Sequence, residues 1–229
     1  MPNYYRNRLT VQHESTERVE EVMAAIRSEE RDVIDFNCII PQPEPFRGKD
    51  HDGMAESALM WMIERAFPGT LNSWDKELAK KHEQLPEDRR REAEEGARQM
   101  LRNIADYGYA SFLRWSIDNW GTKWNSINGY DDQMWRDGNT IHFGTANGYC
   151  KPVIEALSCM FPDVTFAYAA ADEDKGACTI KGEFRNGEFK GVEEHRTPLA
   201  FAICWELFPE CKEEYHELPD GTWDINEED

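Results

Sequence analysis

Apolar residues along this chain recur with two periods, and the change from one to the other marks where helices and strands are expected. From Val19 to Ile26 they fall on one face of a helix, whose start Ser15 or Thr16 can cap. Similar spacing predicts helices over 152–161 and 199–207. Short apolar runs predict strands at 8–11, 35–40, 140–145 and 164–169, and a hairpin joining 178–184 to 188–191 across Asn186-Gly187. Two further turn signals are Asn128-Gly129 and Asp137-Gly138.

Residues 54–118 differ, because apolar stripes at helical spacing follow one another there without a strand between them. The stripes run over 58–63, 93–104 and 109–120. This region is longer than a β-α-β crossover needs, so it is predicted to be a helical insertion. A weak β-α-β echo between 1–45 and 140–170 suits a ferredoxin-like sheet. We therefore expect an α+β fold: one domain over 1–229, with an antiparallel ferredoxin-like sheet, helices on one face and the insertion at about 54–118.

Charge narrows the range of partners. The 229 residues include 45 acidic and 26 basic side chains, for a net charge of −19. Such a chain is poorly suited to bind phosphate backbones or anionic membranes directly, since both need Lys and Arg. It can bind basic proteins, although net charge also simply keeps proteins soluble. The segment 204–229 is the most acidic, because its only basic residue is Lys212.

The cysteines and the apolar runs indicate the compartment. Six cysteines are scattered without a Cys-x-x-Cys pair, and no apolar run approaches the length of a membrane span. The N-terminus lacks the basic and apolar regions of a signal peptide. We therefore expect a cytoplasmic protein with reduced thiols and no membrane association.

Two blocks stand out as a candidate ligand site. The first is Trp120-Gly121-Thr122-Lys123-Trp124-Asn125, which follows a predicted helix directly. Its polar side chains Thr122, Lys123 and Asn125 could present hydrogen-bond donors to a ligand, with Trp120 and Trp124 as further candidate contacts. The second block, with Thr145 and Asn147, joins a predicted strand to a helix start, where free N–H groups can hold an anion. The alternative is structural, because a tryptophan pair is first of all a large apolar surface to bury.

These blocks also carry a family resemblance. Three stretches resemble the YubB-like (Api-type) proteins of phages and plasmids: the opening residues 1–11, Asn119-Trp120-Gly121-Thr122-Lys123-Trp124-Asn125, and Phe143-Gly144-Thr145-Ala146 followed by Pro152 and Leu157-Ser158. The resemblance implies a ferredoxin-like domain and an origin on a mobile element, with no assigned activity and no catalytic residues. Asn147-Gly148-Tyr149-Cys150 departs from the aromatic, serine and paired prolines expected after Thr-Ala.

The remaining acidic residues, histidines and cysteines show no spacing typical of a metal site or a catalytic site. Asp172-Glu173-Asp174 resembles a solvated turn more than a calcium loop, since it lacks the spacing of an EF-hand. The six histidines and six cysteines have no zinc-finger spacing, and a Cys–His nucleophilic pair has no local signature. We therefore predict no catalytic residues, cofactor or metal site.

Two functions remain as hypotheses. The first is a non-enzymatic, acidic interaction protein that binds a basic host or phage protein. In its sharpest form Glu210, Glu213, Glu214 and Glu217 imitate a nucleic acid. The alternative is a small-ligand or nucleotide-binding domain, possibly an enzyme, with its site near Trp120–Asn125 and Thr145–Asn147. The oligomeric state is left open.

Overall fold

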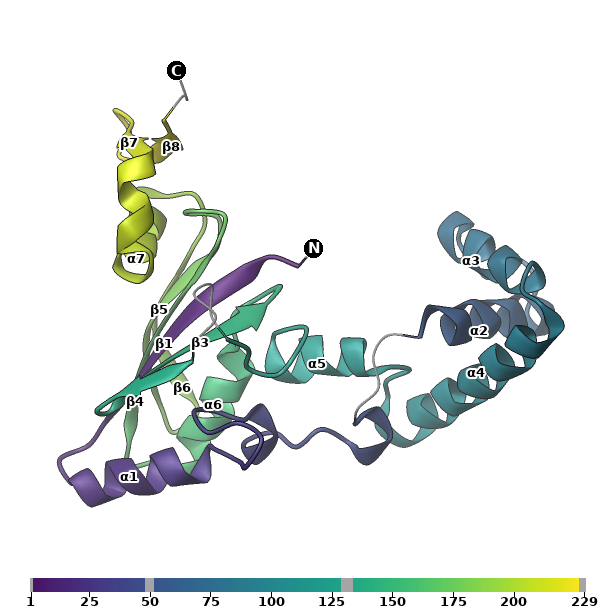
Figure 1. Ribbon diagram of the computed structural model, residues 1–229, viewed down its shortest axis with the longest axis horizontal. Helices are drawn as coiled ribbons and strands as arrows, with labels where there is room; N and C mark the ends of the chain where they lie inside the picture. The colour runs from purple at the N-terminus through teal and green to yellow at the C-terminus, as the bar shows by residue number, and fades with distance from the viewer. Residues whose placement is uncertain (1, 48–51, 129–133, 227–229) are drawn as a thin grey trace. The chain divides into compact units, whose positions relative to one another are not determined.

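The computed structural model describes residues 2–47, 52–128 and 134–226. Its contacts divide the chain into two compact units. We call Met1–Pro41 with Ser116–Asp229 the sheet unit, and Gln42–Trp115 the helical unit (Figure 1). Each unit has its own set of elements and is described separately.

A six-stranded antiparallel sheet forms the sheet unit. The strands are β1 (Tyr4–Gln12), β2 (Trp135–Asp137), β3 (Thr140–Ala146), β4 (Thr165–Asp172), β5 (Thr179–Arg185) and β6 (Glu188–Glu194). Their spatial order is β2-β3-β1-β4-β5-β6. With α1 (Thr16–Ala25) and α6 (Lys151–Met160), the chain order β1-α1-β2-β3-α6-β4 and the spatial order β2-β3-β1-β4 are those of a ferredoxin-like fold. The predicted α+β class is confirmed, and the β5–β6 hairpin extends the sheet.

Local signals account for most of these elements. The Ser15 hydroxyl accepts a hydrogen bond from the Arg18 N–H at 3.2 Å and so caps α1, as predicted. Asn186 and Gly187 both have positive φ, 47° and 79°, which suits the tight turn between β5 and β6. The turn predicted at Asp137-Gly138 joins β2 to β3. Gly129, in the other predicted turn, lies outside the described residues.

Helices cover both faces of the sheet, because successive residues of a strand point to opposite sides. On one face the Tyr168 hydroxyl of β4 accepts a hydrogen bond from the Cys150 N–H at the start of α6. On the other, Ala169 packs against α7 (Pro198–Leu207) through Cys204 and Leu207. The prediction placed helices on one face. The run of small alanines in β4 leaves room for a helix on the second face as well.

The strand predicted at 35–40 is wrong. This segment forms a 3₁₀ turn, Phe36–Cys38. The Asp35 carboxylate accepts from the Asn37 N–H at 2.9 Å, and the Phe36 N–H donates to the Asn125 side chain at 2.9 Å. Side chains thus take the backbone groups that a sheet ladder would need, which is how Asx turns compete with strands.

The helical unit contains α2 (Gly53–Ala66), α3 (Ser73–Glu83) and α4 (Glu87–Tyr107). The division between the units falls within α5 (Phe112–Trp120). The core of the helical unit consists largely of small residues, so α2 and α4 approach closely. Its members are Ala55, Ala58, Leu59, Ala93, Ala97 and Met100. A Cβ on Gly96 would lie 2.7 Å from the Cβ of Ala55. Helices occupy 53–120 as the stripes predict, while the organisation as one domain with an insertion stays a prediction.

The described residues end in a small hairpin that was not predicted from the sequence. After α7 a 3₁₀ segment, Pro209–Glu214, leads to β7 (Tyr215–Glu217) and β8 (Trp223–Ile225). Figure 1 shows this hairpin beside the end of α7. Pro219-Asp220-Gly221 supplies the turn between its strands, and this tripeptide is a turn signal that could have been recognised.

Candidate functional site

The two blocks predicted as a ligand site meet in the structure. The Lys123 N–H donates to the carbonyl oxygen of Ala146 at 2.8 Å. The Thr122 hydroxyl donates to the same carbonyl at 2.7 Å and accepts from the Ala146 N–H at 3.0 Å. Thr122 therefore pairs with both backbone groups of the last residue of β3, as a neighbouring strand would.

Two glycines allow this approach. Gly121 has a φ of 76°, and a Cβ there would lie 2.8 Å from the Tyr149 carbonyl oxygen. A Cβ on Gly148 would lie 2.5 Å from the carbonyl oxygen of Gly121. Both contacts are shorter than real Cβ atoms make, so the junction requires glycine at each position.

Asn125 connects this junction to the turn at Asp35. Its Oδ1 accepts from the Phe36 N–H at 2.9 Å and from the Ser126 N–H at 2.8 Å. Its Nδ2 donates to Asp35 Oδ1 at 2.7 Å. Burial raises the pKa of Asp35, but hydrogen bonds from Asn125, Ser28 and Asn37 outweigh it and leave that pKa below its usual value. Asn125 thus organises the backbone and stabilises a carboxylate.

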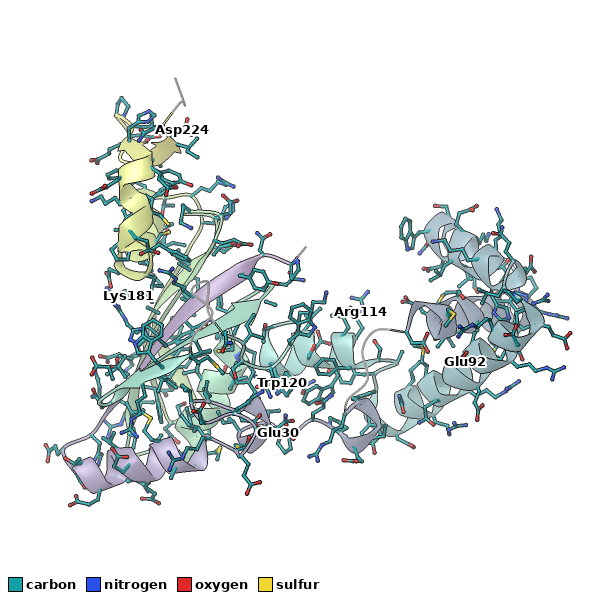
Figure 2. All side chains as sticks on the ribbon, viewed as in Figure 1. Glu30, Glu92, Arg114, Trp120, Lys181 and Asp224 are labelled. Carbon is teal, nitrogen blue, oxygen red and sulfur yellow. The ribbon has the colours of Figure 1, made fainter. Side chains whose placement is uncertain are left out.

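Three of the seven predicted ligand residues are out of reach of solvent. Trp120 and Thr122 are 1% exposed and Thr145 is fully buried. The Trp120 indole donates to the Ile40 carbonyl at 2.9 Å (Trp120 is labelled in Figure 2). The Thr145 hydroxyl donates to the Gly148 carbonyl at 2.7 Å.

The other four predicted ligand residues keep some exposed surface. Asn147 is exposed, and Lys123, Trp124 and Asn125 are half-buried. Lys123 Nζ lies 4.8 Å from the centre of the Trp124 ring. Any ligand contact from these blocks would come from those four side chains.

A buried polar network lies below the junction. Asn7 Nδ2 donates to the Thr145 hydroxyl at 3.0 Å, and the Tyr168 hydroxyl donates to Asn7 Oδ1. Burial raises the pKa of Tyr168 well above its usual value and that of Cys150 to about 12. These groups stay protonated at neutral pH, and their hydrogen bonds satisfy one another within the core.

A second group of titratable side chains lies at the rim of the sheet. Glu193 accepts hydrogen bonds from the Tyr149 hydroxyl and from Lys151, which together lower its pKa. Cys178 Sγ lies 3.7 Å from His195 Nδ1, the Cys–His pairing for which the sequence has no signature. The same nitrogen contacts the Ala177 carbonyl oxygen, which holds a proton on Nδ1. With Nδ1 acting as a donor, His195 cannot take the Cys178 proton through that atom.

The acidic residues of the C-terminal segment fall into two groups. Glu206 is paired with Arg8 at 3.0 Å and with Lys181 (labelled in Figure 2) at 2.5 Å. Glu210 is paired with Arg6 at 2.6 Å. These ion pairs hold α7 and the segment after it against the sheet.

Glu213, Glu214 and Glu217 form the second group. All three are exposed, and no basic side chain in the described part of the chain forms an ion pair with them. Asp224, on β8, is exposed as well (Figure 2). We call Glu213, Glu214 and Glu217 the acidic face. Of the four glutamates predicted to bind a partner, Glu210 is thus the one already engaged within the molecule.

Aromatic packing fixes the position of the acidic face. The Trp205 ring of α7 lies 5.3 Å from that of Tyr215 and 5.4 Å from that of Trp223, both in the hairpin. Lys212 Nζ lies 4.8 Å from the centre of the Trp223 ring. A two-stranded hairpin is marginal alone, so this packing explains why so short a hairpin is ordered.

The structure adds two observations on ions and membranes. Among the described residues, no group of three or more His, Cys, Asp or Glu side chains could hold a metal ion. Within the same ranges, no helix has the length and apolar character needed to cross a bilayer.

Comparisons with known proteins add little. No family model and no curated protein matches the chain. Among solved structures, it is distantly similar to the protein api92 from Yersinia pseudotuberculosis, described with the family model DUF1281. The identity is 11%, the match covers 85% of this chain and 98% of that one, and the TM-score is 0.37. A likeness at this level carries no argument about fold or activity.

Proposed function

We propose that this protein is a non-enzymatic interaction protein whose acidic face binds a basic partner protein. The observation that carries the proposal is the contrast within one segment. Glu206 and Glu210 are neutralised by cations of the sheet, whereas the acidic face is exposed without such pairing. A folded protein that keeps like charges together and uncompensated carries an electrostatic cost, which an oppositely charged partner would remove.

The distribution of charge over the two units supports this proposal. Residues 42–115 hold 14 of the 45 acidic and 12 of the 26 basic side chains, a net charge of −2. The remaining 31 acidic and 14 basic side chains lie in the sheet unit, which therefore carries −17. A field of one sign over one unit accelerates encounter with a cationic partner and fades with salt.

Rigid presentation also favours binding. The packing of Tyr215 and Trp223 on Trp205 holds the hairpin before any partner arrives. Ordering a flexible segment on binding costs free energy, so a preformed acidic face binds more tightly than a disordered acidic tail of equal charge.

The more specific form of the proposal is nucleic-acid mimicry. The partner would then use a nucleic-acid-binding site, where clustered Lys and Arg face a row of negative charges. The sequence resemblance to mobile-element proteins would make that partner a protein of a bacterial host or of a phage. DNA or RNA should compete with this protein for the partner.

The test compares two triply neutralised variants. In the first, Glu213→Gln, Glu214→Gln and Glu217→Gln remove the acidic face while keeping side-chain size. Tagged wild-type and variant proteins are used to capture partners from nuclease-treated bacterial lysate at low and moderate salt. We expect the wild type to capture a basic protein that salt releases and nucleic acid displaces, and the variant to lose it.

The control is a variant in which three negative charges are removed from α4 instead of from the acidic face. Asp88→Asn, Glu95→Gln and Asp106→Asn neutralise three exposed acids of α4. The control should keep the captured partner. If both variants keep it equally, or both lose it equally, the acidic face is not the binding surface.

A further inference from the structure

The helical unit contains a cavity that the proposed function does not use. Its volume is about 320 Å³, at the lower end of the range of ~300–1,000 Å³ usual for small-molecule sites. Phe46, Met100 and Phe112 contribute apolar walls, and Asp52 and Asn103 contribute polar groups. This combination of apolar walls with a few polar groups is typical of ligand sites.

Asn103 presents a hydrogen-bond donor to this cavity, and its neighbours fix its orientation. The Arg102 guanidinium can only donate, and its Nη2 lies 2.7 Å from Gln99 Oε1. Gln99 must therefore point its Nε2 toward Asn103, where it donates to Oδ1 at 2.8 Å. The Nδ2 of Asn103 therefore lies on the side of the amide that faces away from Gln99.

Among the described residues this donor has no acceptor. Asn103 is 5% exposed, and no atom of the described residues accepts a hydrogen bond from its Nδ2. The Nδ2 atom itself is not among the fully buried polar atoms, so water can reach it when no ligand is bound. A ligand with an acceptor at this position would take the place of that water.

Asp52 supplies a negative charge at the rim. Its Oδ1 accepts from the Met54 and Ala55 N–H groups, at 3.1 and 3.0 Å, and so caps α2. Its Oδ2 lies beside Gly96, where a Cβ would be 3.4 Å away. One carboxylate oxygen is thus committed to the helix and the other is directed toward a residue that lines the cavity.

We infer that this cavity binds a small aromatic or aliphatic amine that also carries a carbonyl group. The ammonium group would bind Asp52 Oδ2, the carbonyl oxygen would accept from Asn103 Nδ2, and the apolar body would pack on Phe46 and Phe112. Carboxylates and phosphates are excluded by the charge of Asp52. The inference is independent of the acidic face, which belongs to the other unit.

The probe is L-phenylalaninamide, which has the ammonium, the carbonyl and an aromatic ring. It is titrated into ¹⁵N-labelled full-length protein and followed by NMR. We expect saturable shifts of the Asn103 side-chain amide and of the Gly96 backbone amide. Phenylpropionate, of similar size but anionic, should cause no saturable shift.

Two variants complete the test. Asp52→Asn keeps the helix cap, since Asn and Asp cap equally well, and removes the charge. It should weaken binding of the probe at least tenfold, whereas Asp88→Asn on α4 should not change it. Ala110→Phe, which fills the cavity from its lining, should abolish binding with the circular dichroism spectrum retained.

The inference is overturned by any of three results. These are an absence of saturable shifts at these amides, equal binding of phenylpropionate, or unchanged affinity in both Asp52→Asn and a folded Ala110→Phe.

Discussion

Replacing Asn125 by alanine removes three hydrogen bonds that join the Trp120–Asn125 block to the turn at Asp35. Two are accepted from the Phe36 and Ser126 N–H groups, and one is donated to Asp35. Phe36 is fully buried and Asp35 is 6% exposed, so their groups cannot easily turn to water instead. The variant should therefore lose stability.

The expected loss in the free energy of unfolding is the sum of the contributions of the three hydrogen bonds. Leaving a buried N–H unpaired costs at least about 1 kcal/mol, and a hydrogen bond to a charged group contributes about 1.5–3 kcal/mol. Two N–H groups and one bond to a carboxylate give a loss of about 3.5–5 kcal/mol. Lys123→Ala, at the same junction, removes only a contact with Trp124 and should change stability by less than about 0.5 kcal/mol.

The assay is urea unfolding followed by circular dichroism and tryptophan fluorescence, from which the free energy of unfolding is extrapolated. The pH adds a second readout. The pKa of Asp35 is lowered in the folded protein, so its contribution is present above the unfolded pKa of ~3.9 and is lost as the pH falls through the folded value. The difference between wild type and Asn125→Ala should shrink as the pH falls from 7 toward about 2. A loss below about 1 kcal/mol at neutral pH would refute this structural role for Asn125.

Three further substitutions or treatments test the same region. Thr122→Val keeps the shape but leaves both backbone groups of Ala146 without the hydroxyl, so it should cost about 1–3 kcal/mol in urea unfolding, whereas Thr122→Ser should cost less. Gly148→Ala would bring a Cβ to 2.5 Å from the Gly121 carbonyl oxygen and should lower the melting temperature in calorimetry; an unchanged value would contradict the close approach. Cys150, with a pKa raised to about 12 by burial, should resist iodoacetamide at pH 8 until the protein is unfolded, as peptide mass mapping would show.

Much of the fold follows from local signals in the sequence. The apolar face of α1 with its Ser15 cap and the turn at Asn186-Gly187 are properties of neighbouring residues. Such local signals favour a helix or a turn without contacts from distant parts of the chain. The prediction at 35–40 failed because Phe36 bonds to Asn125, which is 89 positions away in the sequence. A composition typical of a strand could not show that a distant side chain takes the backbone N–H.

The candidate site could be predicted only in part. The sequence predicts a candidate site at Trp120–Asn125 and at Thr145, and the structure places the two blocks together. Their roles depend on contacts such as Thr122 with Ala146, 24 residues apart, and no pattern along the chain contains that information. The pairing of Glu210 with Arg6 is of the same kind, since the two residues are separated by most of the chain. The turn before Trp223, by contrast, follows from the local sequence Pro219-Asp220-Gly221.

The salt dependence of binding to a lysine-rich peptide tests the proposed function most directly. Fluorescence anisotropy of a labelled peptide gives the affinity of the wild type and of the two triply neutralised variants over a range of salt. The account predicts that the wild type and the α4 control lose affinity steeply and in parallel as salt rises. The Glu213→Gln, Glu214→Gln, Glu217→Gln variant should bind more weakly at low salt and depend less on salt. If that variant has the affinity and the salt dependence of the wild type, the acidic face does not bind basic partners.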